Sequence, residues 1–182
     1  MTAADQRECF EQTILPHLDA AYNLARWLVR NPSDAEDLVQ EAMLRAVKFF
    51  HGYRGGDARS WLLAIVRRCC FTWVSRNHAA DLAEEFDELS HSPAPPPNPE
   101  SLSVSGDEAA RLRRALEEIP AVFREAVVLR ELEEMSYKEI AEVAGVSIGT
   151  VMSRIARGRE RLRAVLARPS ETGRRSAGQG AA

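Results

Sequence analysis

The chain has 182 residues, of which 45% are hydrophobic and 28% charged, and its formal net charge is −3 at pH 7. This composition is that of a globular protein with one domain or two small ones. No stretch has the apolar length of a membrane-spanning helix, and the polar start MTAADQRECFEQ lacks the basic and apolar segments of a signal peptide. A cytoplasmic protein without membrane insertion is therefore expected.

The first block, residues 1–77, is predicted to consist of helices joined by turns and a loop. Apolar residues recur at helical spacing from Ile14 to Leu28, ahead of the turn-like sequence RNPSD. Ser33 with Glu36 three residues later forms a capping-box signature, which predicts that the next helix starts at Ser33. A third helix is predicted from about Ser60 to Ser75, after the loop HGYRGGD. No segment alternates convincingly as a strand, so the block is predicted to be all-α.

An acidic stripe lies on the second predicted helix of this block. Asp34, Asp37 and Glu41 are spaced i, i+3, i+7, with Gln40 beside them on an exposed polar face. One interpretation is a solvated helix face, and the other is a docking surface for a basic partner.

The third predicted helix and the loop before it combine basic and aromatic residues. Proteins hold unstacked single-stranded nucleic acid with basic grooves and aromatic platforms. Core packing is the favoured interpretation for Trp61 and Trp73, whereas Tyr53 and Arg54 are better surface candidates. The basic residues are Arg54, Arg59, Arg67, Arg68 and Arg76, and the aromatic or ring-bearing residues are His51, Tyr53, Trp61, Phe71 and Trp73.

An acidic, proline-rich stretch separates the first block from the second. Residues 77–110 contain eight acids but neither lysine nor arginine, and HSPAPPPNPE holds five of the nine prolines. Such a segment has few apolar residues to bury and favours extended conformations. Residues 78–110 are therefore predicted to be an unfolded linker, and residues 169–182 a disordered tail.

The second block, residues 111–168, carries agreeing signals for a helix-turn-helix. Pro120 suits the first position of a helix. Ser136 and Glu139 form a second capping box, Gly145 is suited to end that helix in the left-handed conformation, and Ser147 can cap the next. A helix, a glycine turn of about three residues and a helix constitute the helix-turn-helix pattern.

The last predicted helix, from Ser147 to Arg163, concentrates five arginines in an acidic chain. A solvated face is one explanation; the capped helix-turn-helix before it favours a helix that enters the major groove of DNA. The predicted packing face is Ile148, Val151, Ile155 and Leu162. The predicted outward face is Thr150, Ser153, Arg154, Arg157 and Arg161, with Ser147 at its start.

No constellation of residues points to catalysis. Cys69 and Cys70 are adjacent and Cys9 is distant, so buried free thiols are favoured over a metal site or a redox switch. The histidines have no metal-like spacing, and neither a nucleophile–base pair nor a phosphate-cradling loop stands out. Neither enzyme activity, nor a cofactor, nor a small-molecule substrate is expected.

The chain contains the segments YNLARWLVRNPSDAEDLVQEAMLRAVKFF and RSWLLAIVRR, followed by an acidic linker and a helix-turn-helix. In this order they resemble an extracytoplasmic-function sigma factor of bacterial RNA polymerase. The resemblance covers about residues 10–77 and 111–166. It implies two small all-α domains, region 2 in residues 1–77 and region 4 in residues 111–168, joined by the linker. It also implies core RNA polymerase and promoter DNA as partners, and control by an anti-sigma factor that responds to stress or envelope signals.

The resemblance implies a role for each matching position. The acidic stripe would dock on the polymerase clamp helices, the loop and third helix would melt and read the −10 element, and the last helix would read the −35 element. The docking residues are Asp34, Asp37, Gln40 and Glu41; the −10 residues are Tyr53, Arg54, Arg59, Arg67, Arg68 and Phe71; the −35 residues are Ser147, Thr150, Ser153, Arg154 and Arg157.

Two positions depart from the family pattern. Arg68 and Thr72 stand where many members have asparagine and aspartate, so the −10 sequence preference does not carry over. A two-domain repressor or activator is one alternative, but it would bind its operator alone and would not need the acidic stripe. A decoy that only sequesters an anti-sigma factor is another, but it would have no use for DNA-facing arginines. Two weak DNA contacts joined by the linker would raise each other's effective concentration. Because the net charge is negative, the free chain would repel bulk DNA except at local basic patches, so weak DNA binding is expected without polymerase.

Overall fold

The computed structural model describes residues 3–78 and 106–168, and every regular element in these two ranges is a helix. The predicted tail, residues 169–182, lies outside the described residues, as does most of the predicted linker. The fold class is the predicted one, all-α.

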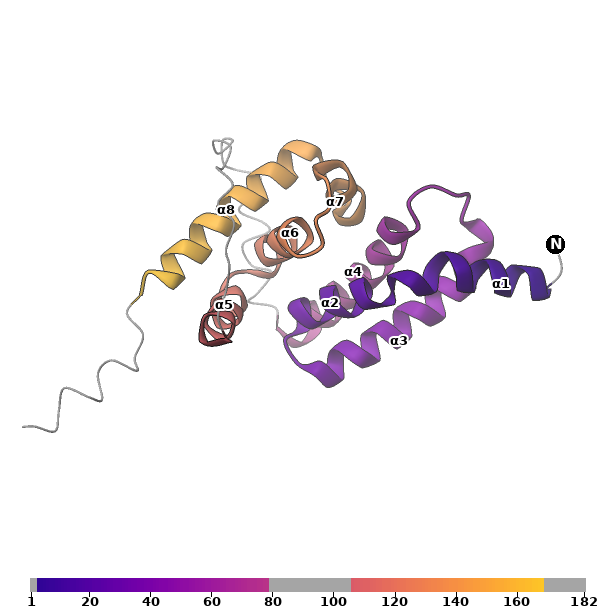
Figure 1. Cartoon of the computed structure of the whole chain (residues 1–182), viewed down its shortest axis with the longest axis horizontal. Helices are drawn as coiled ribbons and strands as arrows, with labels where there is room; N and C mark the ends of the chain where they lie inside the picture. The colour runs from indigo at the N-terminus through magenta and orange to yellow at the C-terminus, as the bar shows by residue number, and fades with distance from the viewer. Residues whose placement is uncertain (1–2, 79–105, 169–182) are drawn as a thin grey trace, which may run out of the picture.

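The helices form two groups that lie side by side (Figure 1). The group at residues 3–78, called the first half below, and the group at residues 106–168, called the second half, each contain four α-helices. The first half comprises α1 (Ala3–Ile14), a short 3-10 helix (Leu15–His17), α2 (Leu18–Val29), α3 (Pro32–Phe49), a second 3-10 helix (Phe50–Gly52) and α4 (Ala58–Asn77). The second half comprises α5 (Gly106–Glu118), α6 (Ala121–Glu131), α7 (Tyr137–Ala144) and α8 (Ile148–Leu166).

The start of α3 differs from the prediction. Asn31, not Ser33, caps the helix: its side-chain oxygen accepts from the backbone N–H groups of Ser33 and Asp34 at 2.8 and 3.4 Å. Pro32 occupies the first turn, where its missing N–H costs nothing and its fixed φ suits a helix, so the cap falls one residue before it. The start predicted at Ser33 was wrong for this reason.

Two other helices also begin earlier than predicted. Asp57 caps α4 by accepting from the backbone N–H groups of Arg59 and Ser60 at 3.1 and 3.2 Å, which moves its start to Ala58. Helix α5 begins at Gly106, so residues 106–110 belong to a helix and not to the predicted linker. Local composition misplaced this boundary because the first turn of α5 contains glycine and acids.

The predicted helix-turn-helix is confirmed at α7 and α8. Ser136 and Glu139 form the capping box, with both reciprocal hydrogen bonds present. Gly145 ends α7 at φ 67°, in the left-handed region that favours glycine. The hydroxyl of Ser147 then caps α8 by accepting from the Thr150 N–H at 3.1 Å. Local chemistry at Gly145 and Ser147 thus fixes the turn between the two helices.

Helix α6 is buried around its whole circumference. Each residue from Ala121 to Leu129 is buried, because α2 covers one side of the helix and α8 covers another. Arg124 is 0% exposed and satisfies the end of α5, since its Nη1 donates to the carbonyls of Ile119 and Glu117 at 3.1 and 3.2 Å. Its buried charge is thus met by carbonyl oxygens that a helix C-terminus leaves without partners.

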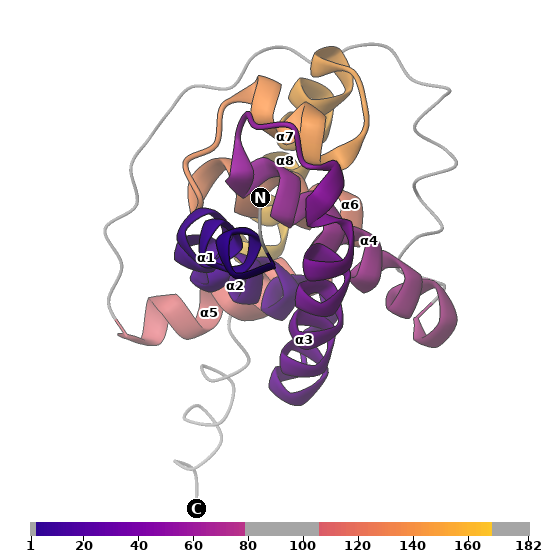
Figure 2. The same ribbon diagram turned by 90° about the vertical axis from the view of Figure 1, so that its right-hand side faces the viewer.

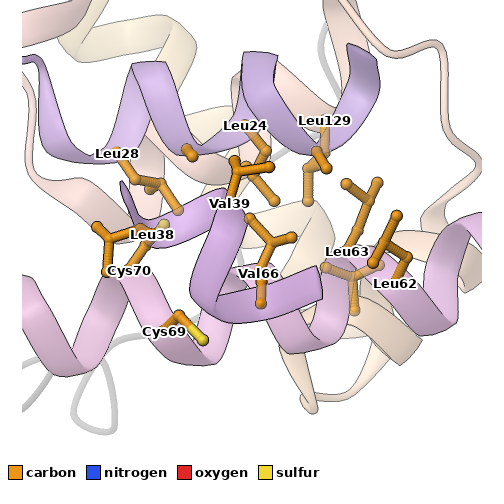
Figure 3. Close-up of a cluster of buried hydrophobic side chains, with 14 of the residues drawn as sticks. Leu24, Leu28, Leu38, Val39, Leu62, Leu63, Val66, Cys69, Cys70 and Leu129 are labelled. Atoms are coloured by element: carbon orange, nitrogen blue, oxygen red, sulfur yellow. The ribbon is translucent and has the colours of Figure 1, made fainter. Parts of the chain in front are cut away.

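The two halves share one hydrophobic core. Leu129 of α6 lies in a single cluster with Leu24 of α2 and Leu63 of α4, and Figure 3 shows the three side chains close together. In turn, Trp27 of the first half packs against a cluster of Leu116, Ile119 and Val127 in the second half. Helix α7 also packs on α4 (Figures 1 and 2). The two predicted helical groups are therefore packed onto each other.

The close approach of α8 to α6 at Gly158 generates a stability prediction. A Cβ at this position would lie 2.6 Å from Val127 Cγ2 and 3.0 Å from the Phe123 carbonyl oxygen. Helical glycine to alanine ordinarily gains about 1 kcal/mol, but forcing a methyl group into this contact costs roughly 1–3 kcal/mol. We expect Gly158→Ala to lower the free energy of unfolding, measured by urea denaturation.

Gly149 in the same helix supplies the matched control. The nearest atom to a Cβ at this position would be Ser147 Oγ at 3.8 Å, an ordinary contact. We expect Gly149→Ala to raise the free energy of unfolding. Equal stabilisation by both substitutions would contradict the packing of α8 on α6.

Candidate nucleic-acid interface

The loop before α4 is held in shape by stacked rings. The Tyr53 ring stacks on Phe50 with centroids 5.7 Å apart and lies 5.2 Å from the Trp61 ring. The Tyr53 hydroxyl donates to the Gly56 carbonyl at 2.7 Å. Gly55 and Gly56 adopt φ of 85° and 99°, which allows this tight return. Arg54 is exposed at the loop, so a basic group is presented next to a fixed aromatic platform.

Along α4, the predicted −10 arginines fall into two sets. Arg68 is exposed, as Arg54 is. Arg59 and Arg67 instead contact carboxylates of the second half: Arg59 Nη2 donates to Glu133 Oε2, and Arg67 Nε donates to Glu125 Oε1 at 2.6 Å. The Arg67 guanidinium carbon also lies 4.3 Å from the centroid of the half-buried Phe71 ring.

The outward face of α8 is partly the predicted one. Ser147 is exposed, and Thr150, Ser153 and Arg157 are half-buried, so these four side chains remain at the surface. Arg154 is 5% exposed, which contradicts its predicted place on the outward face.

The rotation of this face has a physical reason. The buried positions of α8 are Val151, Arg154, Ile155 and Gly158. Gly158 brings the α8 backbone against α6, and the packed stripe therefore runs through Arg154 and not through Ile148, which is 48% exposed. Met152, exposed at 42%, joins the surface that sequence reasoning assigned to small polar and basic residues.

The acidic stripe on α3 lies beside an apolar groove. Asp37, Gln40 and Glu41 are exposed and Asp34 is half-buried, while Glu41 pairs with Arg45 one turn later. The groove runs between α2 and α3, and Leu44 at its edge is 73% exposed. The sequence analysis did not identify this apolar part of the surface. The pattern that could have indicated it is the presence of Leu44 and Val47 at positions of α3 that do not face the core. The lining residues include Leu18, Tyr22, Val39, Gln40, Met43, Leu44 and Val47.

The cysteines occupy two environments. Cys69 and Cys70 are buried in α4, and Cys9 on α1 is exposed. Within residues 3–78 and 106–168, no three metal-binding side chains gather in a potential metal site, and none of the helices has the length and apolarity needed to cross a membrane.

The two halves match known families. Residues 13–80 match Sigma-70 region 2, and residues 109–162 match Sigma-70, region 4. The chain is 38% identical over 171 residues to the ECF RNA polymerase sigma factor SigE of Mycolicibacterium smegmatis, covering 92% of this chain and 65% of that one. It is 34% identical over 142 residues to the ECF RNA polymerase sigma-E factor of Escherichia coli K12, covering 70% and 71% respectively.

Solved structures show the same fold. The sigma factor RpoE of Bartonella quintana, in complex with the anti-sigma factor NepR, is 27% identical with a TM-score of 0.67, covering 87% of this chain and 97% of that one. CnrH, in complex with the cytosolic domain of CnrY, is 26% identical with a TM-score of 0.64, covering 90% and 91%.

A region 2 helix group and a region 4 helix-turn-helix on one chain define the sigma-70 class of transcription initiation factors. Within this class, the chain belongs to the ECF family of RNA polymerase sigma factors. It spans about two thirds of the length of the mycobacterial relative.

The contrast between the cysteines generates a reactivity prediction. Burial raises the pKa of the Cys69 and Cys70 thiols, and the thiolate is the reactive form. We expect iodoacetamide at pH 8 to alkylate Cys9 alone in the folded protein and all three cysteines in denaturant, as counted by mass spectrometry.

A Cys9→Ser variant is the control for this experiment, and it should remain unmodified while folded. Rapid alkylation of Cys69 or Cys70 in the native variant would contradict their burial.

Proposed function

We propose that this protein is a promoter-specificity subunit that binds core RNA polymerase and directs promoter-specific initiation of transcription. The observation that carries the proposal is the presence, on one chain, of a region 2 surface with an aromatic and basic loop and a region 4 helix-turn-helix with a basic second helix. The protein would act by binding polymerase and DNA, and not by catalysing a reaction. It would act in the cytoplasm, where RNA polymerase is found.

The second half would bind duplex DNA at the −35 element. The N-terminal end of α8 presents the small hydroxyl residues Ser147, Thr150 and Ser153, which allow a close approach to base edges in the major groove. Arg157 follows one turn beyond Ser153 and supplies charge for a phosphate or a base edge. Arg154 is packed against the body of the protein in this structure, so Arg157 is the better candidate for a direct contact.

The first half would trap the melted −10 strand. Arg54, next to Tyr53 in the loop, and Arg68, on α4, are exposed cations. Phe50, Tyr53 and Trp61 form an aromatic cluster at the loop. Exposed cations attract the phosphates, and rings can stack on unpaired bases. Arg59, Arg67 and Phe71 complete this proposed surface.

The acidic stripe would dock on polymerase. Asp37, Gln40 and Glu41 lie beside the groove between α2 and α3, so one face combines carboxylates with exposed apolar side chains. An apolar centre with a charged rim is the usual composition of a protein interface. An anti-sigma factor would control the protein, as the complexes of RpoE with NepR and of CnrH with CnrY suggest.

Run-off transcription tests the proposal directly. We expect the purified chain to confer initiation on core RNA polymerase at a subset of a promoter library. Failure at every promoter, although the chain binds the core enzyme, would overturn it. Tight operator binding by the chain alone, seen as a gel shift without polymerase, would favour a repressor or activator instead.

Two substitutions test the division of labour between the halves. Asp37→Ala should weaken core association by about 5–30-fold, since truncation of an interface residue that contributes to binding costs about 1–2 kcal/mol. Arg157→Ala should leave core association unchanged and weaken promoter binding by about tenfold, as removal of a DNA-contacting arginine does. Core affinity is measured by fluorescence anisotropy and promoter binding with the holoenzyme.

The matched controls are Glu8→Ala on α1 and Arg113→Ala on α5, exposed charges outside both proposed surfaces. Equal loss of core affinity in Asp37→Ala and Arg157→Ala would contradict the assignment of separate roles.

A further inference from the structure

One aromatic side chain of α1 contacts the ring cluster at the loop before α4. Phe10 is 8% exposed, and its ring meets the Phe50 ring edge to face, with the centroids 5.1 Å apart and an interplanar angle of 88°. Figure 1 shows α1 at the same end of the first half as this loop. The match to Sigma-70 region 2 begins at residue 13, so Phe10 lies before the matched segment.

Phe50 is the ring on which the other aromatic side chains converge. The Tyr53 ring stacks on it at an interplanar angle of 15°, and the Trp61 ring meets it with centroids 6.3 Å apart. Phe50 is 7% exposed, so protein encloses its ring. Stacked and edge-to-face pairs are the favoured arrangements of aromatic rings. The contact with Phe10 therefore helps to set the position of the ring against which Tyr53 rests.

Tyr53 transmits this position to the backbone of the loop. Its N–H donates to the Phe50 carbonyl at 3.0 Å, and its hydroxyl donates to the Gly56 carbonyl at 2.7 Å. A Cβ at Gly55 or Gly56 would have no atom within 4 Å, so packing around the glycines does not hold the loop. Because glycine has the greatest backbone freedom, the shape of the loop depends on the stacked rings and on the hydrogen bonds of Tyr53.

We propose that Phe10 is a positioning residue for capture of the melted −10 strand. Phe10 fixes Phe50, and through Phe50 and Tyr53 it holds the loop in the shape that receives an unpaired base. The inference rests on the proposed function, because that function assigns this loop to the melted strand. Phe10 does not itself touch DNA; it lowers the cost of ordering the loop when the strand binds. Helix α1 thereby contributes to promoter opening as well as to the hydrophobic core.

The substitution Phe10→Leu tests the proposal in the full chain assembled with core RNA polymerase. It keeps the site apolar and removes the ring, and swaps of this kind are among the mildest changes to a core. The initiation rate is measured at one promoter in two forms, a full duplex and a form whose −10 segment is unpaired by mismatches. On the duplex we expect a loss of about tenfold, the factor that ordering one or two side chains on binding costs. The loss should be much smaller on the unpaired form, because mismatches remove the cost of unpairing that strand capture must offset.

Hydrogen exchange measures the order of the loop directly. The Tyr53 N–H is hydrogen-bonded within the loop, so its exchange reports local opening. We expect this amide to exchange faster in Phe10→Leu than in the unsubstituted chain, as followed by mass spectrometry of peptides that cover residues 50–57.

Ile14→Val is the matched control for lost packing. Ile14 lies one turn after Phe10 on α1, is 0% exposed and carries no ring. The substitution should lower the free energy of unfolding in urea, as removal of a buried methyl group does. It should change neither the ratio of duplex to unpaired initiation nor the exchange of the loop. Circular dichroism and core association establish that each variant is folded; if Phe10→Leu does not fold, Phe10→Met is measured in its place.

A double substitution tests whether Phe10 acts through Phe50. Substitutions at two residues that act through one contact are not additive. We expect Phe10→Leu combined with Phe50→Leu to lose no more duplex initiation than Phe50→Leu alone. Additive losses, or equal losses on the two promoter forms, would show a general structural role for Phe10 and overturn the proposal.

The unsubstituted chain separates this result from the proposed function. If it initiates with core polymerase while Phe10→Leu leaves either duplex initiation or the exchange of the loop unchanged, the proposed function stands and the positioning role is refuted. If the unsubstituted chain binds core polymerase but initiates nowhere, the proposed function fails, and with it the positioning role that rests on it.

Discussion

The burial of α6 on all sides is the constraint on which both halves depend. One side of this helix lies against α2, and another lies against α8 at Gly158, so a single element completes the core of the second half and joins it to the first. A helix in this position is expected to be apolar throughout. Arg124 and Glu125 break that pattern, and each is satisfied by a group from another element.

The polar residues on this central helix tie the two halves together. Arg124 ties α5 and α2 to α6 through backbone carbonyls, whereas Glu125 ties α4 to α6 through the Arg67 side chain. The contact between the halves therefore has one component made by a backbone carbonyl and one made by two charged side chains.

The local signals predicted much of the fold because they act through neighbouring residues. The capping box at Ser136, the left-handed turn at Gly145 and the cap at Ser147 each involve a few consecutive residues, and all three were confirmed. The start of α3 was wrong because Pro32 moved the cap to Asn31. The sites were predicted by periodicity and resemblance, and periodicity failed at Arg154, where the approach of α6 to Gly158 rotated the buried stripe.

The order of the residues was enough to establish the all-α class, the caps at Ser136 and Ser147, the helix-turn-helix and the resemblance to the sigma family, because these depend on local chemistry and on ordered motifs. Which charges stay at the surface depends instead on how the packed helices meet. The sequence does not distinguish three arginines of α4, namely Arg59, Arg67 and Arg68. In the structure, Arg59 pairs with Glu133 and Arg67 pairs with Glu125, whereas Arg68 is exposed. Those partners are 74 and 58 residues away along the chain, and no local pattern encodes contacts at that separation.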